Sequence, residues 1–118
     1  MLPRIHRLKK KKDFEKVYKK GKGFRQDFLF LKSLNNDSEV SRIGIVVSKK
    51  VALRATVRNL IKRRIRAAVK ELIPNMKPGQ DIVINTLTGV DKETDFKKVK
   101  TAVKELLLKS GIINKNKQ

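Results

Sequence analysis

The spacing of hydrophobic residues near the start of the chain predicts a short basic helix. Within residues 8–23, Phe14, Val17 and Tyr18 recur at intervals that place them on one side of a helix. Gly21 stands where a residue in the left-handed conformation would end that helix.

Residues 49–73 carry the longest amphipathic pattern and predict a helix that ends at Pro74. Thr56 is expected to cap its N-terminus, which places Arg54 in the preceding connection. One side of this helix is apolar: Val57, Ile61, Ile65, Ala68 and Leu72. Another side carries cations and one amide: Arg58, Asn59, Lys62, Arg63, Arg66 and Lys70.

Residues 91–108 predict a last helix, with Gly111 as its stop. Its apolar positions are spaced for burial: Phe96, Val99, Val103, Leu106 and Leu107. Glu93 and Asp95 are expected in its first turn, where acids complement the helix dipole.

Four short stretches predict strands. Residues 28–34 and 42–48 flank a turn-forming Asn-Asn-Asp-Ser segment and are expected to pair as an antiparallel hairpin. Residues 81–84 form a β-branched strand, and residues 23–25 suggest a further, very short one. The order of helices and strands predicts an α+β sandwich, with long helices packed on one small sheet.

The length of 118 residues fits one domain, which we expect to span residues 1–113. Residues 114–118 are expected to form a disordered basic tail. No apolar run approaches the ~18 residues of a membrane span, and no secretory segment follows the basic N-terminus. We therefore expect a cytoplasmic protein.

The net charge restricts the choice of partner. Lys and Arg number 31 against 11 Asp and Glu, which gives a net charge of +20. A cationic field of this size requires a polyanion, and nucleic acid is the abundant one. An anionic membrane or an acidic protein is a weaker candidate.

Few residues could support catalysis by the protein itself. The chain has no cysteine, and its single histidine, His6, excludes a multi-histidine metal site. His6 could act as a general base, although no visible carboxylate would orient it. Glu93 and Asp95 could hold a metal ion, although a place at the start of a helix explains them better. We expect neither a catalytic nor a metal-binding residue.

The basic helix is the strongest candidate for a binding surface. Neighbouring cations on one helix face repel one another, so an external anion is expected to compensate them. Arginine binds phosphate oxygens with two hydrogen bonds, and Asn59 can contact sugar or base edges. A structural rRNA-binding protein would share this pattern, whereas a sequence-specific DNA reader fits poorly because no helix-turn-helix pair precedes the helix.

Several blocks of the sequence resemble one family. R-N-x-x-K-R-x-x-R begins at Arg58 and follows R-x-G-x-x-V-S-K-K, which begins at Arg42. R-L-K-K begins at Arg7, D-F-x-x-V-Y at Asp13 and D-I-V-I at Asp81. Together they resemble the bacterial ribonuclease P protein component, the small basic subunit that partners a catalytic RNA in removing 5′ leaders from precursor tRNA. The resemblance extends across most of the chain.

The resemblance implies a fold of αβββαβα order, of a type also found in a ribosomal-protein domain, with an unusual left-handed βαβ crossover. It also implies a holoenzyme in which the RNA and its bound Mg²⁺ hydrolyse the phosphodiester bond, while the protein alone, expected to be a monomer, does not cut. The catalytic RNA and precursor tRNA would be its partners. The expected RNA-subunit contacts are Lys49, Lys50, Arg54, Arg58, Asn59, Lys62, Arg63 and Arg66.

In this family a cleft between the first helix and the sheet holds the single-stranded leader. By position, Phe14 and Tyr18 on the helix, with Phe28 and Phe30 on the strand, would line that cleft. Unpaired bases stack on aromatic side chains for ~1–3 kcal/mol each, with little sequence preference. Phe28 and Phe30 share one face of the predicted strand, and that face could instead belong to the core.

The chain departs from the family pattern in three places. Ala52, Leu53 and Arg54 stand where G-N is common, so the connection before the basic helix is one residue longer. Ala67 stands where an acidic or amide residue is frequent. Residues 85–87 lack the basic residue often found after the fourth strand.

Overall fold

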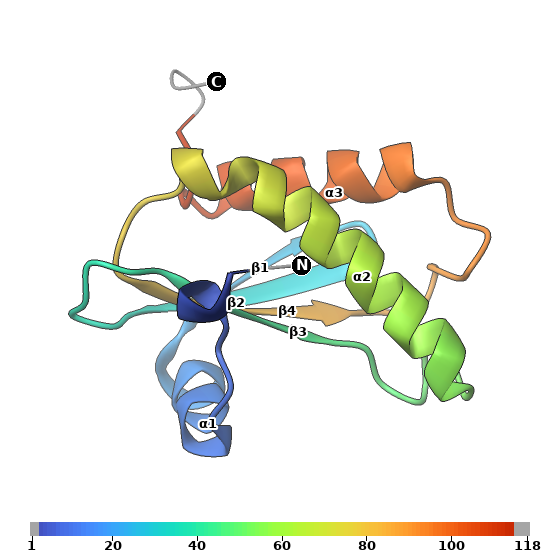
Figure 1. Cartoon of the computed structure of the whole chain (residues 1–118), viewed down its shortest axis with the longest axis horizontal. Helices are drawn as coiled ribbons and strands as arrows, with labels where there is room; N and C mark the ends of the chain where they lie inside the picture. The colour runs from blue at the N-terminus through green and yellow to red at the C-terminus, as the bar shows by residue number, and fades with distance from the viewer. Residues whose placement is uncertain (1–2, 115–118) are drawn as a thin grey trace.

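The computed structural model describes residues 3–114, and residues 115–118 of the predicted tail lie outside this range. The elements are η1 (Arg4–His6), α1 (Lys11–Lys20), β1 (Lys22–Gln26), β2 (Leu29–Asn35), β3 (Arg42–Val46), α2 (Ala55–Leu72), η2 (Ile73–Asn75), β4 (Gln80–Thr86) and α3 (Phe96–Lys109). Apart from the two single-turn 3₁₀ helices, this is the αβββαβα order that the resemblance implied (Figure 1).

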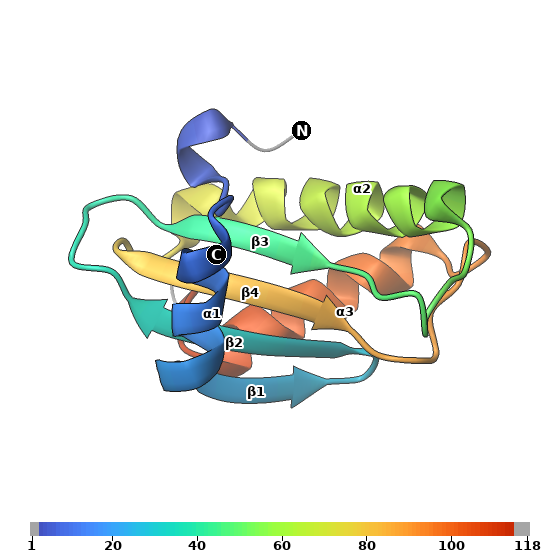
Figure 2. The same ribbon diagram turned by 90° about the horizontal axis from the view of Figure 1, so that it is seen from below.

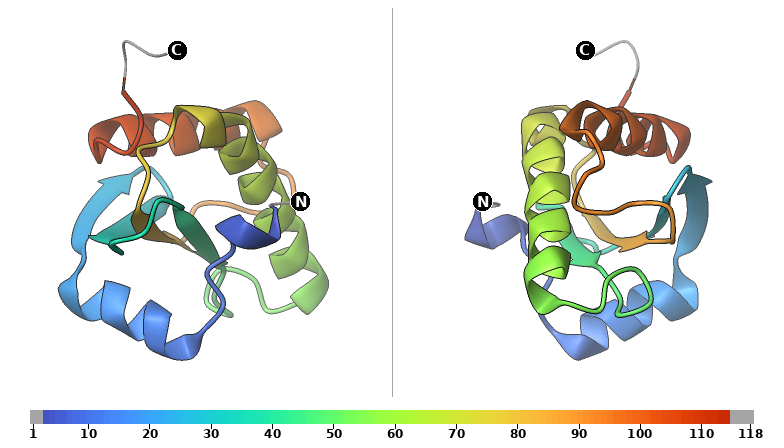
Figure 3. Two further views of the ribbon diagram at one scale, coloured as in Figure 1. Left: turned by 60° about the vertical axis from the view of Figure 1, so that its left-hand side comes forward. Right: turned by 90° about the vertical axis from the view of Figure 1, so that its right-hand side faces the viewer.

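The four strands form one mixed sheet in the order β1-β2-β4-β3. β2 pairs antiparallel with both β1 and β4, whereas β3 lies parallel to β4. α1 covers one face of the sheet, and α2 and α3 cover the other (Figure 3). The α+β sandwich is confirmed, with helices on both faces of the sheet.

The expected hairpin between β2 and β3 is wrong, because β4 lies between these two strands. β4 is buried on both faces: Val83 packs beneath α1, and Ile82 and Ile84 belong to the core beneath α2 and α3. A strand that is apolar on both sides is typical of the centre of a sheet. The hairpin occurs one strand earlier, between β1 and β2, where Asp27 turns the chain with φ of 52°.

The connection from β3 to β4 is a left-handed crossover. In Figure 2, β3 and β4 point in the same direction, β4 lies below β3, and α2 returns behind the sheet. About 98% of βαβ units have the opposite hand. The implied handedness is confirmed, and it places α2 and α1 on opposite faces of the sheet.

The start of α3 differs from the prediction. α3 begins at Phe96 because the Asp95 carboxylate accepts a hydrogen bond from the Lys97 N–H at 3.0 Å and caps the helix. Glu93 therefore lies before the helix, and Phe96 is exposed rather than buried. The predicted stop at Gly111 is confirmed, with φ of +78° just after the helix ends.

Two other helix ends also differ from the predictions. Arg54, not Thr56, is the N-cap residue of α2, and it makes no side-chain capping bond. Gly21 ends α1 in an extended conformation, with φ of −75°, rather than a left-handed one. Glycine is required there for close packing, because a Cβ atom would lie 2.9 Å from the Ser33 carbonyl oxygen.

The Arg42 side chain connects α1 to the sheet through two carboxylates. Its Nε and Nη2 atoms donate to the two oxygens of buried Asp81 at 2.9 and 2.7 Å. Its Nη1 atom lies 3.4 Å from Asp13 of α1. The hydrogen bonds with Asp81 raise the pKa of Arg42 above its usual value. Arg42 is therefore a structural residue of the family motif.

Replacing Arg42 with Ala should lower the free energy of unfolding by about 2–3 kcal/mol, because it leaves the buried Asp81 carboxylate without its charged donor. The exposed pair Lys11–Glu15, with 3.9 Å between its charged atoms, supplies the control. Lys11→Ala should change stability by less than about 0.5 kcal/mol. Urea unfolding followed by circular dichroism measures both, and equal losses would contradict the structural role of Arg42.

Candidate RNA interface

The expected RNA-subunit residues all lie on α2 and on the lead-in loop, residues 47–54, that precedes it. Lys49, Lys50, Arg54, Asn59 and Arg63 are exposed. Arg58, Lys62 and Arg66 are only partly exposed. No Asp or Glu occurs between Glu39 and Glu71, so this surface has no acidic residue of its own segment to neutralise it.

Two arginines of α2 hold loops instead of projecting freely into solvent. Arg58 Nη1 donates to the carbonyl oxygens of Ala52 and Leu53 at 2.9 and 2.7 Å. Arg64 Nη1 donates to the carbonyl oxygens of Lys92 and Thr94 at 2.8 and 3.1 Å, which fixes the connection before α3. The sequence pattern grouped Arg58 with the phosphate-binding cations and gave no sign of its contacts with the loop.

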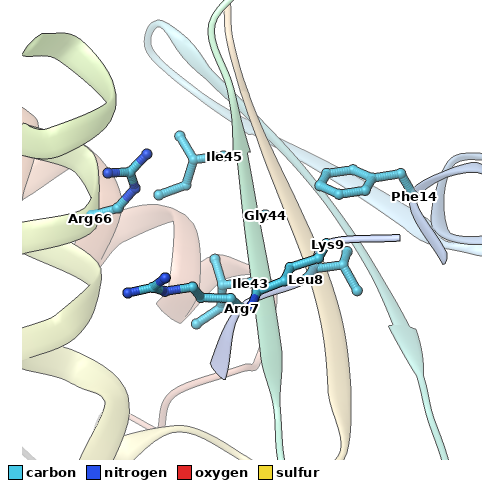
Figure 4. A pocket seen from close by; sticks show the side chains of 8 residues that line it. All are labelled: Arg7, Leu8, Lys9, Phe14, Ile43, Gly44, Ile45 and Arg66. Atoms are coloured by element: carbon cyan, nitrogen blue, oxygen red, sulfur yellow. The ribbon is translucent and has the colours of Figure 1, made fainter. Parts of the chain in front are cut away.

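A pocket of about 340 Å³ lies along the outer edge of β3 (Figure 4). Arg66 of α2 and Arg7 present their guanidinium groups on one side of the strand, and Phe14 of α1 lies on the other. Leu8 extends the sheet edge here, since its N–H donates to the Ile43 carbonyl oxygen at 3.0 Å. None of the eight lining residues is acidic, so the pocket suits an anion such as a phosphate group.

The face of the sheet beneath α1 carries the aromatic residues expected to hold the leader. The Phe14 ring lies against Gly44 of β3, where it occupies the space that a Cβ atom would need. The Tyr18 hydroxyl donates to Asn85 Oδ1 of β4 at 2.7 Å, and the Tyr18 side chain is 38% exposed. Phe30 pairs with Asn85 across β2 and β4, so their side chains share this face.

Phe28 lies elsewhere, so its expected place in the leader cleft is wrong. It belongs to the hairpin turn before β2 and is buried in the core beneath α2 and α3. The expectation assumed that Phe28 and Phe30 occupy alternate positions of one strand, but the strand begins only at Leu29. Of the four predicted aromatics, the structure brings Phe14, Tyr18 and Phe30 to one face of the sheet.

Comparison with known proteins places this geometry in a family. The family model for ribonuclease P matches residues 2–111. A ribonuclease P protein component from a Pseudanabaena species is 39% identical over 98% of this chain and 100% of its own length. One from Clostridioides difficile is 41% identical over 89% of this chain and 91% of its own. The chain belongs to the ribonuclease P protein component family.

Solved structures of the family share the fold. The ribonuclease P protein of Staphylococcus aureus superposes with a TM-score of 0.83 at 29% identity, covering 92% of this chain and 98% of that one. The Thermotoga maritima protein superposes with a TM-score of 0.80 at 29% identity, covering 87% and 96%. The family resemblance and the fold that it implied are therefore both confirmed.

Asn85 is a site residue that the family motifs did not reveal. Besides accepting from Tyr18, its amide has a buried nitrogen, Nδ2, with no hydrogen-bond partner among the described residues. Its sequence signal is a lone amide at the end of the apolar D-I-V-I strand.

A second pocket of about 330 Å³ lies between the lead-in loop and the ends of β1 and β4. It is lined by Arg25 and Lys50 together with the hydroxyl groups of Ser48, Thr86 and Thr88.

The residues considered for protein catalysis have structural contacts. His6 Nδ1 donates to the Ser41 carbonyl oxygen at 2.8 Å, and Asp95 caps α3. Across residues 3–114, no three His, Cys, Asp or Glu side chains gather as a metal site would require. Within the same residues, no helix combines the length and apolarity needed to cross a membrane.

The Tyr18 phenol should ionise at a higher pH than free tyrosine. Partial burial raises its pKa above the ordinary value of about 10. The unfolded chain then loses the proton first, so the stability that Tyr18 contributes is present below pH ~10 and is lost as the pH rises through the folded pKa. Tyr18 is the only tyrosine and the chain has no tryptophan, so tyrosinate absorbance reports this group alone. Ionisation at or below the pH found after urea unfolding would contradict the raised pKa of Tyr18.

Proposed function

We propose that this chain is the protein subunit of a cytoplasmic ribonuclease P ribonucleoprotein. α2 and the lead-in loop bind the catalytic RNA, and the α1 face of the sheet binds the single-stranded 5′ leader of precursor tRNA. The observation that carries the proposal is the placement of a cationic surface, whose own segment has no acid between Glu39 and Glu71, and an aromatic surface on the two sides of β3. A structural rRNA-binding protein would need only the first of these surfaces.

The cationic surface has the chemistry for a phosphate backbone. Lys62, Arg63 and Arg66 lie within one turn and a half of α2, and none of them has an acidic partner within 4.0 Å in the described chain. An RNA strand would replace their mutual repulsion by attraction and release counterions. Arg7 and Arg66 extend this surface to the edge of β3, toward the leader side.

The aromatic surface has the chemistry for unpaired bases. Tyr18 presents an exposed ring whose hydroxyl is fixed by Asn85, and the ring of Phe30 lies over Gly23 of β1. Lys32 lies two residues after Phe30 on the same face of β2 and donates to the Tyr18 carbonyl oxygen at 2.6 Å, which adds a cation to this surface. Stacking combined with charge neutralisation binds single strands with little dependence on their sequence.

In this proposal hydrolysis belongs to the RNA partner. The RNA binds the Mg²⁺ ions that activate water, which is the chemistry such ions supply in phosphoryl transfer. The protein contributes cations that neutralise phosphates and a surface that retains the leader. Neither contribution requires a nucleophile or a general base from the chain.

Replacing Lys62, Arg63 and Arg66 together with Ala should lower the slope of log affinity against log salt by about two to three units, because about three phosphate contacts are lost. The probe is a bacterial ribonuclease P RNA transcribed in vitro. Arg58 is left intact because it holds the lead-in loop. The control replaces Lys97, Lys98 and Lys104 of α3, which are exposed and remove the same charge. Equal slope changes in the two variants would contradict α2 as the RNA surface.

Tyr18→Ala should weaken precursor tRNA binding to the reconstituted holoenzyme by about 1–3 kcal/mol and leave mature tRNA binding nearly unaltered, because only the precursor carries unpaired leader bases. Tyr18→Phe is the matched control, since it keeps the stacking ring and loses only the hydroxyl. Fluorescence titration with labelled tRNAs measures both. Equal weakening of precursor and mature tRNA in a folded variant would remove the leader assignment.

A further inference from the structure

Leu53 is an exposed apolar side chain at the tip of the lead-in loop. It is 85% exposed, compared with 64% for Ile5 and 38% for Tyr18. The loop lies at the end of the molecule where α2 begins, beyond the ends of β3 and β4 (Figure 1). A single exposed leucine is ordinary on a protein surface, so the contacts and charges around it decide whether it has a role.

The backbone that carries Leu53 is held in place. Arg58 Nη1 bonds the carbonyl oxygens of both Ala52 and Leu53, at 2.9 and 2.7 Å. On the other side of the tip, the N–H groups of Val51 and Ala52 donate to the Ser48 carbonyl oxygen at 3.1 and 3.3 Å. A side chain on a backbone fixed in this way loses less conformational entropy when it binds a partner.

The exposed cations near Leu53 favour RNA as its binding partner. Lys49, Lys50 and Arg54 are all exposed within four residues of it. The absence of acids between Glu39 and Glu71 makes the whole tip attractive to RNA. Base faces are the large apolar surfaces that RNA offers, and they are accessible where bases are unpaired or unstacked.

We propose that Leu53 packs against the face of an unstacked base in the catalytic RNA, with Arg58 as the positioning residue that holds the tip. The inference rests on the proposed function, in which α2 binds that RNA. The contact adds an apolar contribution to an interface that is otherwise made of charges.

Salt dependence separates this contact from the phosphate contacts. Leu53→Ala should weaken binding of an in vitro transcribed bacterial ribonuclease P RNA about tenfold at every salt concentration, with the log–log slope unchanged, because no charge is lost. Leu53→Met should restore most of the affinity, since it keeps an apolar side chain of similar volume. Ile5→Ala, the matched exposed control, should have no effect.

A double-mutant cycle tests the role of Arg58. If Arg58 positions the tip, Leu53→Ala should cost much less than tenfold when Arg58 is already Ala. Arg58→Ala alone should lower the RNA affinity by more than the loss of a single phosphate contact would, while the slope of log affinity against log salt falls by about one unit. A full tenfold cost of Leu53→Ala in the Arg58→Ala background would overturn the positioning role.

Unchanged RNA affinity in folded Leu53→Ala would overturn the Leu53 contact. The proposed function would still stand if the Lys62, Arg63 and Arg66 replacements lower the slope of log affinity against log salt. A change in slope on Leu53→Ala would also overturn the Leu53 contact, because the side chain would then act only by arranging nearby cations. Sedimentation of the free protein and binding to phosphatidylglycerol vesicles complete the test. If Leu53→Ala weakens self-association or vesicle binding while RNA affinity is unchanged, the base contact is overturned.

Discussion

The burial of β4 on both faces is the constraint on which the rest of the structure depends. Val83 packs beneath α1, and Ile82 and Ile84 pack beneath α2 and α3. β4 separates β2 from β3 and leaves β3 at the sheet edge, and α2 crosses over on the face opposite α1. The left-handed crossover thus sets the cationic helix and the aromatic face on opposite sides of one edge strand.

Electrostatic repulsion within that arrangement is only partly relieved by the protein itself. The carboxylates of Asp13 and Asp81 both pair with Arg42. Arg58 and Arg64 are committed to backbone carbonyl groups, which fix the loops at each side of α2 without neutralising any charge. The remaining cations of α2 repel one another in the free protein. Phosphate groups of a bound RNA would replace this repulsion by attraction and release counterions, which favours binding.

Local sequence patterns predicted the helices and strands well but not the order of the strands in the sheet. The apolar sides of α2 and α3 follow from helical spacing, and Ile61, Ile65 and Val103 are buried as expected. Strand order depends on contacts distant in sequence, so the turn after β2 suggested a hairpin that β4 prevents. The family motifs supplied the crossover, which periodicity does not encode. Phe28 was misplaced because it lies in the hairpin turn just before β2, where the alternation of side chains between the two faces of a strand does not apply.

The central claim is that the protein assists cleavage by an RNA and takes no direct part in the chemistry. Single-turnover cleavage of precursor tRNA by a bacterial ribonuclease P RNA, measured across a Mg²⁺ titration with and without the protein, tests it most directly. We expect the protein to lower the Mg²⁺ requirement, because its positive field neutralises phosphates, and Ala at His6, Glu93 or Asp95 to change the rate by less than about tenfold. A loss of about a hundredfold from any one of these substitutions, with binding unaltered, would show that the protein acts in the chemical step and would contradict the account.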